Sequence, residues 1–177
     1  MTESRRVLDS LRQELELWER HLAPVSDEDA AAPRLPNGWS VKDLMAHLAA
    51  WQQVTIARLE AARNGMPPHL PDWLQGGDPD SDDEVHRYNA RIHERDRHRS
   101  WSDVHDAWRS GFERVLRLAA AIPAADLERP GRFAWLDGHR LLDVLDGTYR
   151  HHHDDHLPKL VAALPEGRGD TGPAGAA

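Results

Sequence analysis

Residues 141–160 read LLDVLDGTYRHHHDDHLPKL, and their apolar positions recur at the spacing of an α-helix. The stripe consists of positions 141, 145, 149, 152, 156 and 160, which are separated by steps of three or four residues. Two of these positions are histidines, His152 and His156, so the pattern predicts that they replace core residues on one face of a helix. A buried imidazole needs a hydrogen-bond partner or a metal ion.

The neighbours of these two histidines are expected to be solvated. His151 lies off the stripe and is expected to point away from it, and His153 lies on its rim. A single inward histidine is more often a hydrogen-bonded core residue than a metal ligand, so a polar core network without metal remains an alternative. Pro158 removes an α-helical hydrogen bond, which predicts a bend near Asp154.

A third candidate ligand, His47, lies on a different predicted helix. That helix begins at the capping sequence Ser40-Val-Lys-Asp43 and ends near Asn64, and His47 is on the edge of its apolar stripe. One histidine from one helix and a pair from another would give three imidazoles with open coordination positions, as is typical of catalytic sites. Three neutral nitrogen ligands suit Zn, Ni, Fe(II) or Co, and the sequence does not distinguish among these metals.

Four further side chains are candidates for roles around the three histidines: Asp43 and Asp155 for orienting an imidazole, and Trp51 and Tyr149 for lining a substrate cleft. The alternative for both carboxylates is a charge on a helix surface. Trp51 lies one turn after His47, which makes it the best candidate for the wall of the site. Trp108 lies in the middle of an apolar stripe and is expected in the core.

The pattern along the chain predicts an all-α protein. Long amphipathic segments cover about residues 7–22, 40–64, 100–122 and 139–164, and a shorter polar helix covers about residues 83–97. Residues 65–83 are rich in Gly, Pro and acidic residues and are expected to form a loop with Trp73 as its anchor. We therefore expect a four-helix bundle over residues 1–164 with a long, partly helical connection between the second and third main helices, followed by a disordered tail at 165–177.

Composition excludes several classes of function. The 177 residues contain no cysteine, so the chain supplies neither a thiol nucleophile nor a thiolate metal ligand. The net charge of −8 disfavours nucleic acid as a partner. No segment approaches the roughly 18 apolar residues of a membrane span, and the N-terminus lacks an apolar signal region, so a cytoplasmic location is expected. The expected partner is a small-molecule substrate, and a homodimer is left open.

Two stretches resemble the DinB-like (DinB/YfiT) four-helix bundle superfamily of metal-dependent enzymes. Residues 38–48, GWSVKDLMAHL, resemble its second-helix signature, and residues 148–158, TYRHHHDDHLP, resemble its fourth-helix signature. The middle of the chain, residues 88–92 and the helix around 108–122, is similar to the ClbS/DfsB branch. The resemblance covers roughly residues 5–164 and implies a metal site formed by His47, His152 and His156.

The resemblance also implies a range of activities. The superfamily includes thiol transferases that use mycothiol, bacillithiol or glutathione, a mycothiol-dependent maleylpyruvate isomerase, and self-protection proteins that hydrolyse a strained ring. It thus implies a metal-dependent hydrolase or thiol S-transferase that neutralises a small electrophile, with water or a low-molecular-weight thiol as the nucleophile. The alternative from a different class is a resistance protein that sequesters a small molecule without catalysis.

Overall fold

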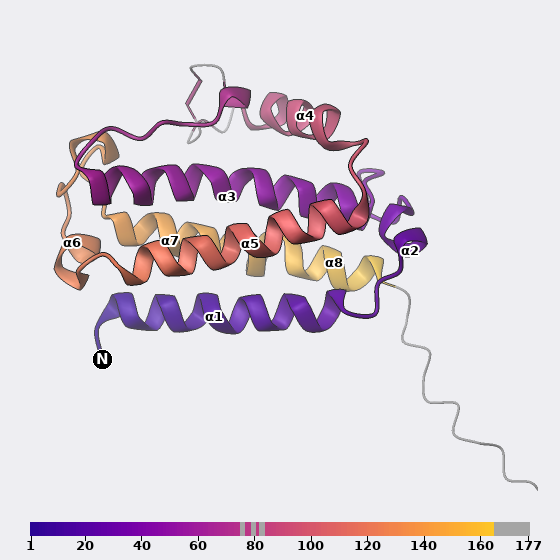
Figure 1. Ribbon diagram of the computed structural model, residues 1–177, viewed down its shortest axis with the longest axis horizontal. Coiled ribbons are helices and arrows are strands. Elements are labelled where there is room, and N and C mark those ends of the chain that lie inside the picture. The colour runs from indigo at the N-terminus through magenta and orange to yellow at the C-terminus, as the bar shows by residue number, and fades with distance from the viewer. Residues whose placement is uncertain (75–76, 79–80, 82–83, 165–177) are drawn as a thin grey trace, which may run out of the picture.

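The computed structural model describes residues 1–74, 77, 78, 81 and 84–164. Its bundle is made of α1 (Glu3–Leu22), α3 (Val41–Asn64), α5 (Trp101–Ala120) and a composite fourth helix (Figure 1). The fourth helix consists of α7 (Leu141–Arg150), the π-helical turn η3 (His151–His156) and α8 (Leu157–Ala163). The predicted all-α bundle is confirmed, and its four long segments lie close to the predicted ranges.

Short elements connect the long helices. The short helix α2 (Asp27–Ala31) precedes α3, and α6 (Ala124–Glu128) and η2 (Ala134–Leu136) precede α7. The connection between α3 and α5 contains η1 (Asp72–Leu74) and α4 (Val85–Asp96), and α4 lies on the outer side of α3 (Figure 1). This connection is partly helical, as predicted, and Trp73 is buried within it. The predicted tail at 165–177 lies outside the described residues. Among the residues that the structure describes, no helix has the length and apolarity to cross a membrane.

A reciprocal pair of hydrogen bonds fixes the start of α3, the helix that carries His47. The Ser40 hydroxyl accepts a hydrogen bond from the Asp43 amide at 3.1 Å, and the Asp43 carboxylate accepts one from the Ser40 amide at 2.9 Å. These bonds satisfy amides that have no partner inside the first turn of a helix. The helix ends at Asn64 and is followed by Gly65, whose φ of 67° favours glycine.

The centre of the bundle is aromatic. Trp18 of α1 packs against Trp108 of α5 with ring centroids 5.8 Å apart, and both side chains are fully buried. The core position expected for Trp108 is therefore confirmed. Helix α5 approaches α3 closely at Gly111, because a Cβ atom at this position would lie only 2.3 Å from the Gln52 side-chain oxygen. A larger residue at this position would have to displace the end of the Gln52 side chain.

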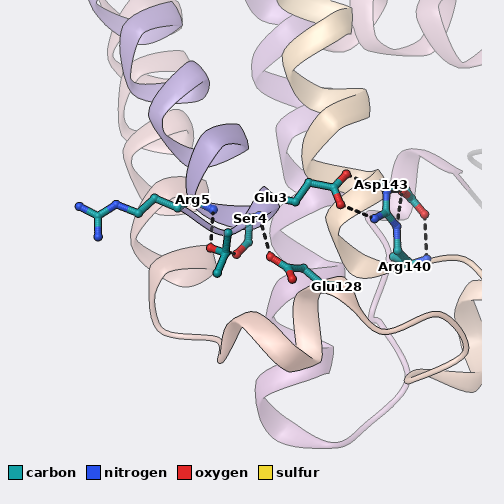
Figure 2. A network of polar contacts seen from close by, with 7 residues as sticks. Glu3, Ser4, Arg5, Glu128, Arg140 and Asp143 are labelled. Atoms are coloured by element: carbon teal, nitrogen blue, oxygen red, sulfur yellow. Dashed lines mark hydrogen bonds and ion pairs between the residues drawn. The ribbon is translucent and has the colours of Figure 1, made fainter.

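A charged network ties together one end of the bundle (Figure 2). Arg140, at the start of α7, donates to the Glu3 carboxylate of α1 at 2.8 Å and to the Asp143 carboxylate at 2.7 Å. Next to it, the Ser4 amide donates to the Glu128 carboxylate of α6 at 2.8 Å. The network joins the first turns of α1 and α7 to α6. It therefore fixes how these helices meet at the end of the bundle opposite α8.

Replacing Ser40 with alanine should lower the free energy of unfolding by about 1–2 kcal/mol, because the buried capping hydroxyl and its bond to Asp43 are lost. Ser100→Ala is the matched control, since Ser100 caps α5 from an exposed position through a single bond to the Asp103 amide. It should cost about 0.5–1 kcal/mol. Urea denaturation measures both values, and a smaller cost at Ser40 than at Ser100 would contradict the importance of the reciprocal pair.

Candidate metal centre

The π-helical turn η3 brings together two histidines that are five residues apart. In an α-helix, positions i and i+5 point in directions about 140° apart around the axis. The wider turn changes this, and the Leu157 amide donates to the His152 carbonyl five residues earlier. As a result the Nε2 atoms of His151 and His156 lie 3.1 Å apart. The position at which a bend was predicted, Asp154, lies within this turn, where the helix departs from α-helical geometry.

His47 of α3 completes a cluster of three imidazoles. Its Nε2 atom lies 3.1 Å from Nε2 of His151 and 3.2 Å from Nε2 of His156. We call His47, His151 and His156 the histidine cluster. The three side chains offer ligand atoms that are close enough to hold one metal ion. The prediction that His47 and His156 converge from two different helices is therefore confirmed.

The expected third member was wrong, because His152 does not reach the cluster and His151 does. The His152 side chain is 1% exposed and lies in the core, where its Nδ1 donates to the Thr148 carbonyl at 2.8 Å. Its Nε2 accepts from the Trp108 indole at 3.4 Å and faces the Gln52 amide at the same distance. His152 is thus the hydrogen-bonded core histidine that was the alternative interpretation for a single inward imidazole.

The physical reason for this correction is a change of register within the fourth helix. The apolar stripe assumed α-helical spacing throughout, which aligns His156 with His152. The π-helical turn adds one residue to a turn, so His156 aligns with His151 instead. Pro158 was the available signal, because its ring and missing N–H disfavour the α-helical bond to Asp154. The sequence pattern correctly placed His152 in the interior.

Burial keeps the clustered imidazoles neutral. Burial lowers the pKa of His47 well below its ordinary value, and the neighbouring His151 and His156 lower it further. Burial also lowers the pKa of His151 to about 4 and that of His156 to about 3. At neutral pH all three rings are therefore uncharged, which is the form that coordinates a metal ion.

The geometry of the cluster fits a divalent cation better than a set of hydrogen bonds. Each Nε2 atom is either a donor or an acceptor, so among three mutual contacts at least one joins two donors or two acceptors. A cation between the nitrogens removes this conflict because all three then present lone pairs. Ligand nitrogens lie about 3.3–3.4 Å apart in a tetrahedral zinc site and about 2.9–3.1 Å apart on an octahedral face. The observed separations of 3.1–3.2 Å fall within this span.

The carboxylates predicted to orient the imidazoles form no hydrogen bond to the cluster. Asp43 is engaged in the capping pair with Ser40 and lies 3.6 Å from His93. Asp155 is exposed at the rim of the cleft and acts on His151 only through its charge. The Nδ1 atoms of His47 and His156 are buried and have no hydrogen-bond partner among the described residues. Among the described residues, no carboxylate–histidine pair therefore fixes these two rings, which are instead held by packing.

The cluster opens onto a cleft of about 1530 Å³ between α3, α4 and the fourth helix. The cluster histidines contribute to its lining, together with aromatic side chains (Trp39, Trp51 and Trp135), cationic side chains (Arg58, Arg140 and Lys159) and the amide of Asn89. Trp51 lines the cleft as predicted, with its ring centroid 6.3 Å from that of His47. Thr55 of α3 and Thr148 of α7 also line the cleft, and a hydrogen bond of 2.9 Å joins their side chains.

Tyr149 lies elsewhere, so its expected place in the wall of the cleft was wrong. Its ring stacks on His153 with centroids 5.1 Å apart and faces α1. The physical reason is again helical geometry: Thr148 and His151 face the cleft, so Tyr149 between them points toward α1. Sequence reasoning also missed Asn89 of α4, which approaches the site only because α4 packs across α3.

Residues 10–157 match the DinB superfamily. The match spans most of the chain. The chain belongs to the DinB superfamily. The match is to the superfamily as a whole, and it agrees with the helical bundle and with a histidine cluster that could hold a metal ion. The comparisons with curated proteins and with solved structures gave no significant match.

The stability of the metal-free protein should fall as the pH decreases from about 6.5 toward 4. In the folded state burial lowers the pKa of His152 to about 3, so the unfolded state binds more protons in this range. His152→Leu removes this buried group and should flatten the dependence by up to about 1.4 kcal/mol per pH unit. Urea denaturation with EDTA at pH 7, 6 and 5 measures the slope.

His98→Gln is the control for this experiment, because His98 is exposed in the turn that follows α4. It should leave the slope of the wild-type protein unchanged. A free energy of unfolding that stays constant between pH 7 and pH 5 would contradict the burial of neutral imidazoles.

Proposed function

We propose that the protein binds a divalent metal ion through His47, His151 and His156 and acts on a small electrophilic molecule in the adjoining cleft. The reaction is either hydrolysis or transfer of a low-molecular-weight thiol to the electrophile. Zn, Ni, Fe(II) and Co all suit three imidazole ligands. A divalent cation supplies Lewis acidity, which lowers the pKa of water or of a thiol that reaches it.

The observation that carries this proposal is the conflict among the three Nε2 atoms. Their mutual separations of 3.1–3.2 Å cannot all be hydrogen bonds, and a shared cation satisfies all three nitrogens at once. The neutral state of the rings at physiological pH favours the same interpretation. The alternative from the sequence was a polar network without metal. His152 and its partners form such a network, whereas the cluster does not.

The nucleophile in the two proposed reactions is water or a thiol. Because the sequence contains no cysteine, the thiol has to be a cosubstrate. The cleft of about 1530 Å³ exceeds the roughly 300–1,000 Å³ of ordinary small-molecule sites, so there is room for both an electrophile and a thiol cosubstrate. The volume supports the transferase form of the proposal without excluding hydrolysis.

The metal site can be tested by the same substitution at two adjacent positions. His151→Leu should abolish binding of zinc, because it removes one of three ligands, whereas His152→Leu should retain binding with a Kd within about threefold of wild type. Isothermal titration calorimetry with zinc, after purification without an affinity tag, measures both. If His152→Leu does not fold, His152→Gln replaces it and keeps a hydrogen-bonding side chain in the core. Loss of binding only at His152 would refute the proposed ligand set.

Catalysis can be separated from sequestration by counting turnovers. The wild-type protein loaded with metal should convert many equivalents of an epoxide per chain in the presence of water or a low-molecular-weight thiol. His156→Leu should fold, since leucine is apolar and of comparable size, but its rate should fall at least about a hundredfold. Mass spectrometry of the products gives the number of turnovers and shows whether sulfur is added.

A sequestering resistance protein would give a different result. Wild type would then stop at about one equivalent per chain, and His156→Leu would capture the same amount. This outcome would overturn the catalytic part of the proposal while leaving the metal titration to decide the ligand set.

A further inference from the structure

Asn89 of α4 holds an amide group beside the histidine cluster. The helix is anchored to α3 by Tyr88 and Ile92, whose side chains are 0% and 1% exposed. Asn89 is half-buried on the adjoining face of α4, lines the cleft and is close enough to interact with the His47 side chain. It therefore reaches the site from an element that carries none of the cluster histidines.

The orientation of this amide is determined by Trp51. The Trp51 indole nitrogen lies 3.1 Å from the Asn89 side-chain oxygen, and an indole N–H can only donate a hydrogen bond. The atom facing Trp51 must therefore be Oδ1, and the Nδ2 amino group points to the other side. Trp51 is itself held in place by Trp73, whose ring centroid is 5.2 Å away. The amide is thus oriented before any ligand binds.

Apart from its interaction with His47, the Asn89 side chain forms a hydrogen bond only through Oδ1 within the described part of the chain, and Asn89 lines the cleft, so its Nδ2 N–H groups are left for a ligand. We infer that Asn89 donates a hydrogen bond to an oxygen atom of the small molecule that binds at the histidine cluster. The ligands selected in this way carry a carbonyl, carboxylate or ether oxygen close to the atom that approaches the metal. This inference rests on the proposed function and adds a positioning residue and a ligand class to it.

Two substitutions separate this role from a role in holding Trp51. Asn89→Asp retains an oxygen that accepts from Trp51 but removes the donors, and Asn89→Leu removes both functions without adding charge. Both variants should load Co(II) as wild type does, because neither changes a cluster histidine. The visible absorption of Co(II) then reports ligand binding at the metal.

The probes are acetohydroxamate, which binds metals through oxygen, and imidazole, which offers no oxygen. Both variants should raise the Kd of acetohydroxamate about five- to tenfold relative to wild type, as expected for one lost hydrogen bond. The Kd of imidazole should stay within about twofold. Circular dichroism confirms that the variants are folded.

Three results would overturn the inference alone. Wild-type affinity for acetohydroxamate in Asn89→Asp would mean that the residue only holds Trp51. Equal weakening of both probes in both variants would mean that it shapes the cleft in general. A wild-type protein that binds imidazole but not acetohydroxamate would contradict the oxygen preference. Failure of the wild type to bind Co(II) would instead overturn the proposed metal site, and this inference with it.

Discussion

A widened helical turn determines which side chains can meet in this protein. Pro158 cannot donate the hydrogen bond that an α-helix needs at its position, and its ring crowds the carbonyl of Asp154. The chain adopts a π-helical turn just before it, in which the Leu157 amide bonds to the His152 carbonyl. The extra residue in this turn places His151 rather than His152 opposite His47, so the cluster depends on it.

The bundle around this turn gives each residue of the triple histidine a different environment. His151 faces the cleft, and His152 is surrounded by the aromatic core. His153 points to the opposite side, where its Nδ1 donates to the buried Glu14 carboxylate of α1 at 2.8 Å. Glu14 in turn accepts from the Trp18 indole at 2.7 Å. The three consecutive imidazoles thus have three separate roles. His152 and His153 hold the turn in place through their hydrogen bonds, and His151 belongs to the cluster.

The cleft combines neutral nitrogen ligands with aromatic walls and few oriented donors. Burial keeps the cluster imidazoles uncharged, so their lone pairs are available without loss of a proton. Trp39 and Trp51 lie within 5.5 Å and 6.3 Å of the His47 ring, measured between centroids. Such surroundings exclude bulk water from one side of the site and strengthen the electrostatic effect of a bound cation. The site thus has the features of a small-molecule centre in a bundle core.

The sequence by itself determined the helices, the capping pair at Ser40 and the buried positions of Trp108 and His152. These follow from local periodicity and local hydrogen bonding, which neighbouring residues decide. Only the tertiary structure decided that His151 belongs to the cluster and that Asn89 reaches it. The first depends on a one-residue change of register, which a stripe of fixed period cannot represent. The second depends on how α4 packs across α3, a contact between residues far apart in the chain.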